Sequence, residues 1–132
     1  MKSLFLSFVG AMSLLAAVSA ESHHSFAAEF DVNRPVKLTG TVTKLEWTNP
    51  HAWVFIDAKD DSGKVQSWAV ELVGINDLLR RGWGRDRVKQ GDTINVDGFG
   101  AKNGTNTANA ASVTLANTGE LLWASVPRTA GN

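Results

Sequence analysis

The sequence predicts a mainly β fold with one short helix. Apolar and polar residues alternate with a period of two in several stretches between residues 36 and 115, which is typical of half-buried strands. Segment 75–83 instead carries the end signals of a helix. Three strands, a short helix and two more strands are the order of a five-stranded OB-like barrel with the helix between strands 3 and 4. A small sandwich and an open sheet with one helix are the alternatives.

The first strand is expected over residues 36–43, where apolar residues and glycine alternate with lysine and threonine. The apolar phase then shifts to Leu45 and Trp47, which indicates a β-bulge or a sharp bend. A bend suits a barrel, because its strands must curl before the sheet can close.

Segments 52–59 and 64–72 form the next two strands, and the Asp-Asp-Ser-Gly sequence between them has the composition of a turn. If Lys59 faces Lys64, three further pairs follow: Trp53 with Val70, Phe55 with Trp68, and His51 with Leu72. This register places His51 beside Glu71. A turn one residue shorter would pair these two residues directly.

The helix over 75–83 has a capping residue at its start in Asn76 and a glycine, Gly82, that can close it in the left-handed conformation. Trp83 is expected to fold back on Leu78. The remaining strand segments, which close the sheet around a hairpin turn at 102–105, are 92–100, 108–115 and 121–123.

The N-terminal segment has the features of an export signal. Lys2 precedes an apolar run from Leu4 to Val18, and Val18-Ser19-Ala20 supplies small residues at a cleavage site. The run is shorter than the roughly 20 residues that cross a bilayer. We therefore expect residues 1–20 to be a signal peptide, 21–126 to be one OB-like domain with an N-terminal lead-in, and 127–132 to be a flexible tail. The mature protein would be periplasmic or secreted, with no stable membrane anchor.

Composition narrows the classes of partner. Removing 20 residues from 132 leaves 112, and takes one lysine from 13 basic residues but none of the 13 acidic ones, so the mature chain has a net charge of −1. This balance predicts no nucleic-acid partner. The chain has no cysteine, so its stability must come from packing and any metal site must use histidine, carboxylates, methionine, backbone groups or the N-terminal amine.

Five segments resemble a family of small exported bacterial proteins catalogued as a domain of unknown function. They are HHSFAAEFD (23–31), GTVTKLEWTNPHAW (40–53), WAVEL (68–72), LLRRGW (78–83) and KQGD (89–92). The His-His-Ser-Phe and Thr-Asn-Pro-His pieces are the specific part of this resemblance. It implies a periplasmic location and a small β-barrel, and it brings no established activity.

Metal binding is the sharpest functional hypothesis. Cleavage after Ala20 would leave histidine in third position, where the terminal amine, two backbone amides and the His23 imidazole can enclose Cu(II). The alternative metal site combines three imidazoles, those of His23, His24 and His51, with Glu71 as a fourth ligand or as the acceptor that orients His51. A purely structural role, in which His51 only hydrogen-bonds its own loop, is equally open.

The rival hypothesis is a metal-free module that binds a protein, peptide or glycan partner. Its contact residues would be aromatic or basic: Trp47, Trp53, Arg80, Arg81 and Arg85. The arginines can also simply complement the negative end of the helix dipole, and tryptophans are by default core residues. No nucleophile elbow or phosphate-binding glycine loop occurs in the sequence, so we expect no enzymatic activity.

Overall fold

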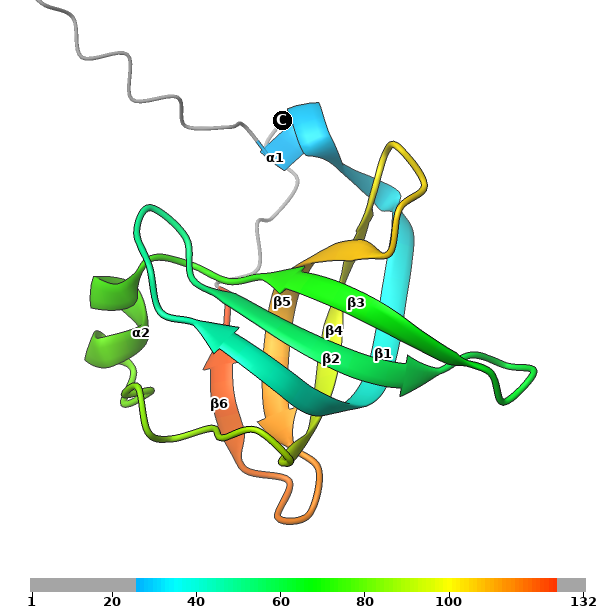
Figure 1. Ribbon diagram of the computed structural model, residues 1–132. Coiled ribbons are helices and arrows are strands. Elements are labelled where there is room, and N and C mark those ends of the chain that lie inside the picture. The colour runs from blue at the N-terminus through cyan, green and yellow to red at the C-terminus, as the bar shows by residue number, and fades with distance from the viewer. Residues whose placement is uncertain (1–25, 126–132) are drawn as a thin grey trace, which may run out of the picture.

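The computed structural model describes residues 26–125, which form a single sheet of six strands with two short helices (Figure 1). In chain order the elements are α1 (Phe26–Glu29), β1 (Phe30–Glu46), β2 (Trp53–Lys59), β3 (Val65–Glu71), α2 (Ile75–Arg80), β4 (Thr93–Ala101), β5 (Thr107–Leu115) and β6 (Leu121–Ala124).

The sheet closes on itself. Its strands follow the order β3-β2-β1-β4-β5-β6, all antiparallel to their neighbours, and β3 also pairs with β5 in parallel. β1 to β5 therefore form a closed ring, with α2 between the third and fourth strands, which is the arrangement of an OB-type barrel. The predicted fold class is confirmed. The one-turn helix α1 was not expected, whereas β6 matches the strand segment expected at 121–123 and pairs with β5 beyond its contact with β3.

β1 bends where its apolar phase shifts. It is 17 residues long and pairs with both β2 and β4. The register between β1 and β2 slips between Val42 and Lys44, just before the shift to Leu45, so the predicted bulge is confirmed. The bulge lets one long strand serve both sides of the barrel.

The predicted register of the β2–β3 hairpin is wrong by one residue. Lys59 lies opposite Val65, not Lys64, and Trp53 therefore lies opposite Glu71. The reason is a longer turn, closed by a hydrogen bond from the Asp60 amide to the Lys64 carbonyl. The Asp60 carboxylate accepts hydrogen bonds from the Ser62 hydroxyl and from backbone amides of the turn, and the Ser62 contact is the main cause that lowers the pKa of Asp60.

The helix begins and ends much as expected, but with a different cap. Gly74, not Asn76, is the N-cap residue, and its own side chain supplies no capping bond. Gly82 closes the helix in the left-handed region with φ 83°, as predicted. Leu78 and Trp83 are both fully buried in the same core cluster, which confirms that the chain folds back after the helix.

The core fills the inside of the barrel. Its largest fully buried members come from the strands, from α2 and from the segments on either side of α2; they are Trp83, Ile56, Leu72, Leu78, Ile94, Val42, Val54, Val70, Val96 and Val113. Four of the five tryptophans belong to this core or pack against it: Trp47, Trp68, Trp83 and Trp123. Trp53 is the exception, and it lies on the outer face of β2.

A β-bulge in β5 changes which side chains of that strand face the core. Asp97 lies opposite Ser112 and Gly98 lies opposite Ala110, so Ala111 has no opposite residue in β4. Beyond the bulge the buried positions switch from the odd-numbered Val113 to even-numbered alanines, and Asn109 points outward. A Cβ atom at Gly98 would overlap the carbonyl oxygen of Asn109.

We therefore expect Gly98→Ala to lower the free energy of unfolding by about 2 kcal/mol, because the new methyl group pushes β4 and β5 apart at this bulge. Urea unfolding followed by tryptophan fluorescence measures the change. Gly84→Ala is the matched control, since its Cβ would meet no atom within 4 Å, and it should change the free energy by less than about 0.5 kcal/mol. Equal stability of the two variants would contradict this account of the bulge.

Candidate functional site

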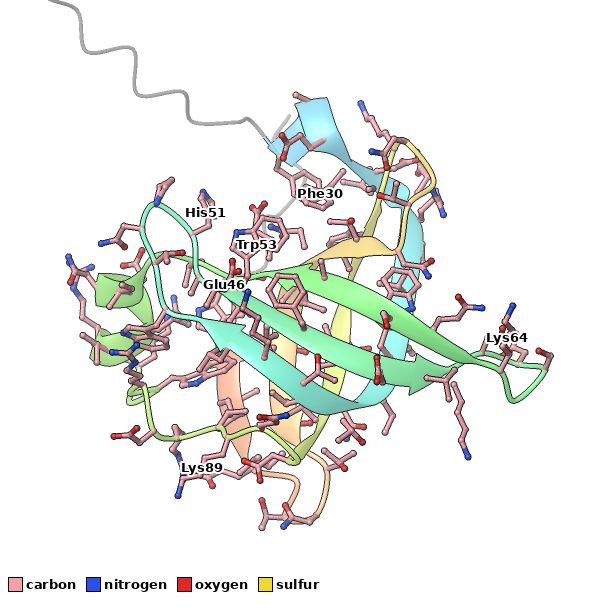
Figure 2. All side chains as sticks on the ribbon, in the orientation of Figure 1. Phe30, Glu46, His51, Trp53, Lys64 and Lys89 are labelled. Atoms are coloured by element: carbon pink, nitrogen blue, oxygen red, sulfur yellow. The ribbon has the colours of Figure 1, made fainter. Side chains whose placement is uncertain are left out.

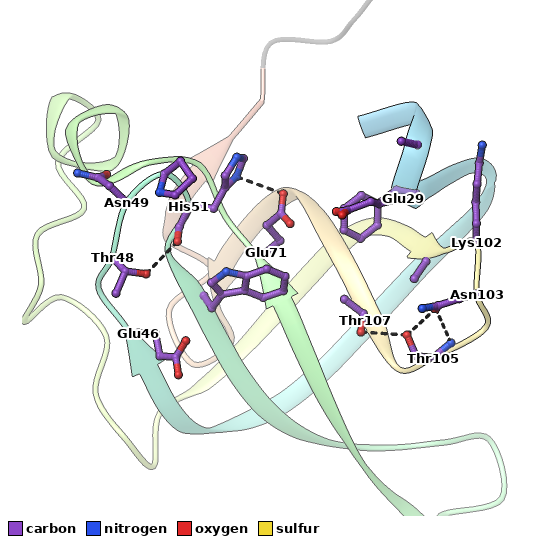
Figure 3. A pocket seen from close by; sticks show the side chains of 15 residues that line it. Glu29, Glu46, Thr48, Asn49, His51, Glu71, Lys102, Asn103, Thr105 and Thr107 are labelled. Atoms are coloured by element: carbon purple, nitrogen blue, oxygen red, sulfur yellow. Dashed lines mark hydrogen bonds and ion pairs between the residues drawn. The ribbon is translucent and has the colours of Figure 1, made fainter. Parts of the chain in front are cut away.

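A groove of about 680 Å³ lies on the outer face of the barrel, where β2, β3 and β5 meet (Figure 3). Three parts of the chain surround it: α1 with the start of β1, the loop between β1 and β2, and the loop between β4 and β5. Figure 2 shows His51, Trp53, Glu46 and Phe30 on the same side of the barrel. The face formed by strands 2 and 3 with these two loops is the usual ligand face of OB-type barrels.

A row of directly opposed residues crosses this face. Glu46 of β1 lies opposite Trp53, which lies opposite Glu71, which lies opposite Asn109. Directly opposed residues have their Cβ atoms about 4.5–5.5 Å apart and share one face of the sheet. The indole of Trp53 is thus flanked by a carboxylate from each neighbouring strand.

His51 is tied to the end of β3 by one of its ring nitrogens. Its Nδ1 atom lies 3.0 Å from the Leu72 carbonyl oxygen and 3.1 Å from Oε1 of Glu71. Both partners are acceptors, so in the neutral ring Nδ1 carries the proton and Nε2 keeps its lone pair. The His51 side chain is 35% exposed, and His51 lines the groove. The ring can therefore present Nε2 to a ligand.

The carboxylate of Glu71 is the buried centre of this arrangement. Glu71 is 9% exposed, and its Oε1 also accepts a hydrogen bond from Nδ2 of Asn109 at 3.3 Å. A buried carboxylate is costly without such donors. His51, Glu71 and Asn109 come from a loop and two strands that are distant in sequence, and together they form one hydrogen-bonded network.

The Thr-Asn-Pro-His loop is shaped by its own side chains. The Thr48 hydroxyl donates to the His51 carbonyl at 3.0 Å, and Oδ1 of Asn49 accepts from the Ile75 amide at 3.1 Å. The Asn49 side chain thus satisfies the first amide of α2, which the expected cap at Asn76 does not. At Gly74 a Cβ atom would lie 2.9 Å from the Pro50 carbonyl oxygen, so the loop and the start of α2 are in close contact.

α1 is fastened to the far side of the groove. The Phe26 ring packs on Phe30 and, edge to face, on Phe99, with ring centroids 5.7 and 5.6 Å apart. The Lys102 amide donates to the Glu29 carbonyl at 2.8 Å, and its ammonium group donates to the Ala27 carbonyl. The segment that follows the two N-terminal histidines in sequence therefore starts at the groove.

The structure brings together three of the residues singled out in the sequence: His51, Glu71 and Trp53, which all line the groove. Trp47 does not line it and packs partly buried against the core. His23 and His24 lie outside the described residues, as do the expected signal peptide and the tail at 127–132. Within residues 26–125, no group of three or more His, Cys, Asp or Glu side chains is placed to hold a metal ion.

The three arginines lie away from the groove. Arg80 pairs with Asp77 at 2.7 Å, one helical turn earlier. Arg81 donates to the Ala124 carbonyl at 2.5 Å and stands over the ring of Trp123. Arg85 is exposed. Two of the three arginines thus hold α2 and β6 in place.

Sequence reasoning missed several residues of the groove and of the hydrogen-bonded network beside it. Glu46 is separated from Trp53 by a loop, and Asn109 lies 38 residues after Glu71, so neither appears beside its neighbour in the sequence. Lys102 was expected only as part of a hairpin turn. A correct register for β2 and β3 would have placed Glu71 opposite Trp53, but no local pattern indicates the β3–β5 pairing.

Fold and groove together define a small OB-type β-barrel with a groove on its outer face. The chain belongs to a family of unknown function (DUF6152), whose sequence model matches residues 12–110. No curated protein sequence matches the chain.

Two solved structures are similar to this chain. One is the mitochondrial single-stranded DNA binding protein Rim1 of S. cerevisiae, with a TM-score of 0.48 and 10% identity over 62% of this chain and 92% of that protein. The other is the N-terminal domain of the PriB protein of Thermoanaerobacter tencongensis, with a TM-score of 0.44 and 16% identity over 63% of this chain and 96% of that domain.

The expectation that excludes nucleic acid as a partner is wrong. It was drawn from the near-neutral charge and the expected export of the chain, whereas the first of these similar structures is named as a single-stranded DNA binding protein. Net charge is a sum over the whole chain, and binding depends on the charges of one face.

Among the described helices none is long and apolar enough to cross a membrane.

We expect Asn49→Ala to lower the free energy of unfolding by about 1 kcal/mol, because it removes the acceptor of the first α2 amide. For a domain of this size that corresponds to a fall of about 4–8 °C in the thermal midpoint. Asn117→Ala is the matched control, an exposed asparagine with no side-chain hydrogen bond recorded among the described residues. If both variants have the same thermal midpoint, the Asn49 side chain does not anchor the helix.

Proposed function

We propose that this protein is a small exported binding module whose groove takes a divalent transition metal, with Cu(II) as the first candidate. Residues 1–20 are removed on export, and Nε2 of His51 is a ligand atom in the groove. Glu71 orients the His51 ring through its contact with Nδ1. The proposal concerns binding and assigns no catalytic step.

One observation carries this proposal: the two acceptors on Nδ1 of His51. Histidines that bind metals almost always donate their other ring N–H to a carboxylate or a backbone carbonyl, which fixes the tautomer and the ring orientation. His51 has both kinds of acceptor, Glu71 and Leu72, at 3.1 and 3.0 Å. These two contacts hold the ring so that Nε2 is the nitrogen left for an ion.

Further ligands can come from the segment before α1. His24 lies two residues before Phe26, the first residue of α1, and Ala28 of α1 lines the groove, so an extended segment adds about 7 Å of reach from the start of α1. His23 and His24 are thereby able to join His51 around one ion. Imidazole nitrogens suit Cu(II), Ni(II) and Zn(II), and Cu(II) binds nitrogen ligands most tightly of the three.

The terminal amine and His23 alone offer a competing Cu(II) site. Adding one residue at the N-terminus distinguishes that site from the groove site. The exported protein is titrated with Cu(II) against a competing chelator, beside a form with one alanine inserted before Glu21. The insertion moves the histidine to fourth position and destroys the amine site, but leaves every side chain in place. The groove proposal predicts one tight equivalent in both forms.

We expect His51→Ala to weaken Cu(II) binding at least about tenfold in both forms, since it removes a preoriented ligand. The dissociation constant and the visible absorption of bound Cu(II) are the readouts, with far-UV circular dichroism as the check on folding. Binding that survives His51→Ala but disappears with the inserted alanine would reject the groove site in favour of the terminal amine.

A second candidate function is favoured by Trp53. Its indole lines a groove that also presents Thr105, Thr107 and Asn103, and aromatic faces beside such polar groups suit the stacking of a sugar ring or an extended peptide. The rival proposal is thus a metal-free module that binds a glycan or peptide through this face.

Titration with an N-acetylglucosamine tetramer and with tetra-alanine, followed by nuclear magnetic resonance of the indole N–H groups, tests this rival. It predicts a concentration-dependent shift of the Trp53 signal with one of the probes, lost in Trp53→Ala. Trp68→Phe, which alters a tryptophan outside the groove, should bind like the wild type. An unshifted Trp53 signal with both probes counts against it.

A further inference from the structure

We infer that Asn109 is a positioning residue. From β5, across the β3–β5 pairing, it holds the Glu71 carboxylate in the place from which Glu71 orients His51. The metal readout of this inference rests on the proposed function, whereas its spectroscopic readout does not.

The barrel closure places Asn109 where it can act. β3 and β5 pair in parallel over only three positions, and the last of them joins Glu71 to Asn109. The bulge at Ala111 then decides that the Asn109 side chain points outward, toward Glu71, while Ala108 and Ala110 face the core. Both features are needed for the 3.3 Å hydrogen bond between the two side chains.

The chemistry of the amide suits this position. The Asn109 amide is an uncharged donor to the carboxylate of Glu71, which is 9% exposed. It therefore helps to satisfy Glu71 without neutralising its charge. A lysine or arginine here would compete with His51 for the carboxylate as a charged partner. The amide instead leaves the negative charge available to the His51 ring.

Asn109 is not among the side chains that line the groove. A ligand in the groove would touch His51 and Trp53, and substitution of Asn109 would act on it only through Glu71. A change in binding on substitution therefore reports the orientation of the network and not the loss of a direct contact.

The test compares Asn109→Leu, which removes the donor at similar volume, and Asn109→Asp, which replaces it with a second carboxylate. The matched control is Asn95→Leu. Asn95 is also an outward asparagine with side-chain hydrogen bonds, to Thr39 and Thr114, but it lies on β4 away from the groove. Two quantities are measured: Cu(II) affinity, and the fraction of His51 in the Nδ1–H tautomer from imidazole ¹⁵N shifts at about pH 8.

We expect both Asn109 variants to lower Cu(II) affinity about tenfold, within the range for residues that orient a ligand, and to lower the Nδ1–H fraction of His51. Asn95→Leu should change neither quantity. The inference is overturned if both Asn109 variants fold and keep the wild-type tautomer fraction. If the wild type binds no Cu(II), the proposed function fails, but the tautomer comparison still decides the role of Asn109. If Asn109→Leu does not fold, the isosteric Asn109→Asp decides alone.

Discussion

The parallel pairing of β3 with β5 is the contact on which the rest of the structure depends. It spans three residue pairs, from Ala69 with Thr107 to Glu71 with Asn109, and it turns an open antiparallel sheet into a barrel. Without it the buried carboxylate of Glu71 would lose an amide donor, and the groove would lose the wall that β5 and the β4–β5 loop supply. Stability and the candidate site therefore rest on the same short seam.

The loop between β1 and β2 links three parts of the molecule. Asn49 satisfies the first amide of α2, and Thr48 donates a hydrogen bond to the His51 carbonyl within the loop. His51 contacts the Leu72 carbonyl at the end of β3. Each side chain has a local partner, so the loop is built before any ligand arrives. Such preorganisation lowers the cost of binding, because the ring of His51 does not have to be ordered at that moment.

The structural and functional explanations of His51 are compatible. The contacts that anchor Nδ1 also leave Nε2 as the atom with a lone pair, so the hydrogen bonds that satisfy the loop are the same ones that would orient the ligand atom under the proposed function. Glu71 has the same double character, since a carboxylate that needs donors in a buried place can also polarise the imidazole beside it. The arginines of α2 differ, because Arg80 and Arg81 have partners within their own surroundings.

The sequence by itself determined the β alternation, the turns, the left-handed close at Gly82 and the bend after Val42, because each depends on residues within a few positions of one another. It also brought His51 near Glu71, although the longer turn at Asp60 shifted the register by one. Only the tertiary structure decided that Trp53 faces Glu71 and that Asn109 completes the network. The bulge at Ala111 reverses the phase of β5, and strict alternation would have put Asn109 on the same face as Val113. The pairing of β3 with β5 joins residues 38 positions apart, and no local pattern encodes such a contact.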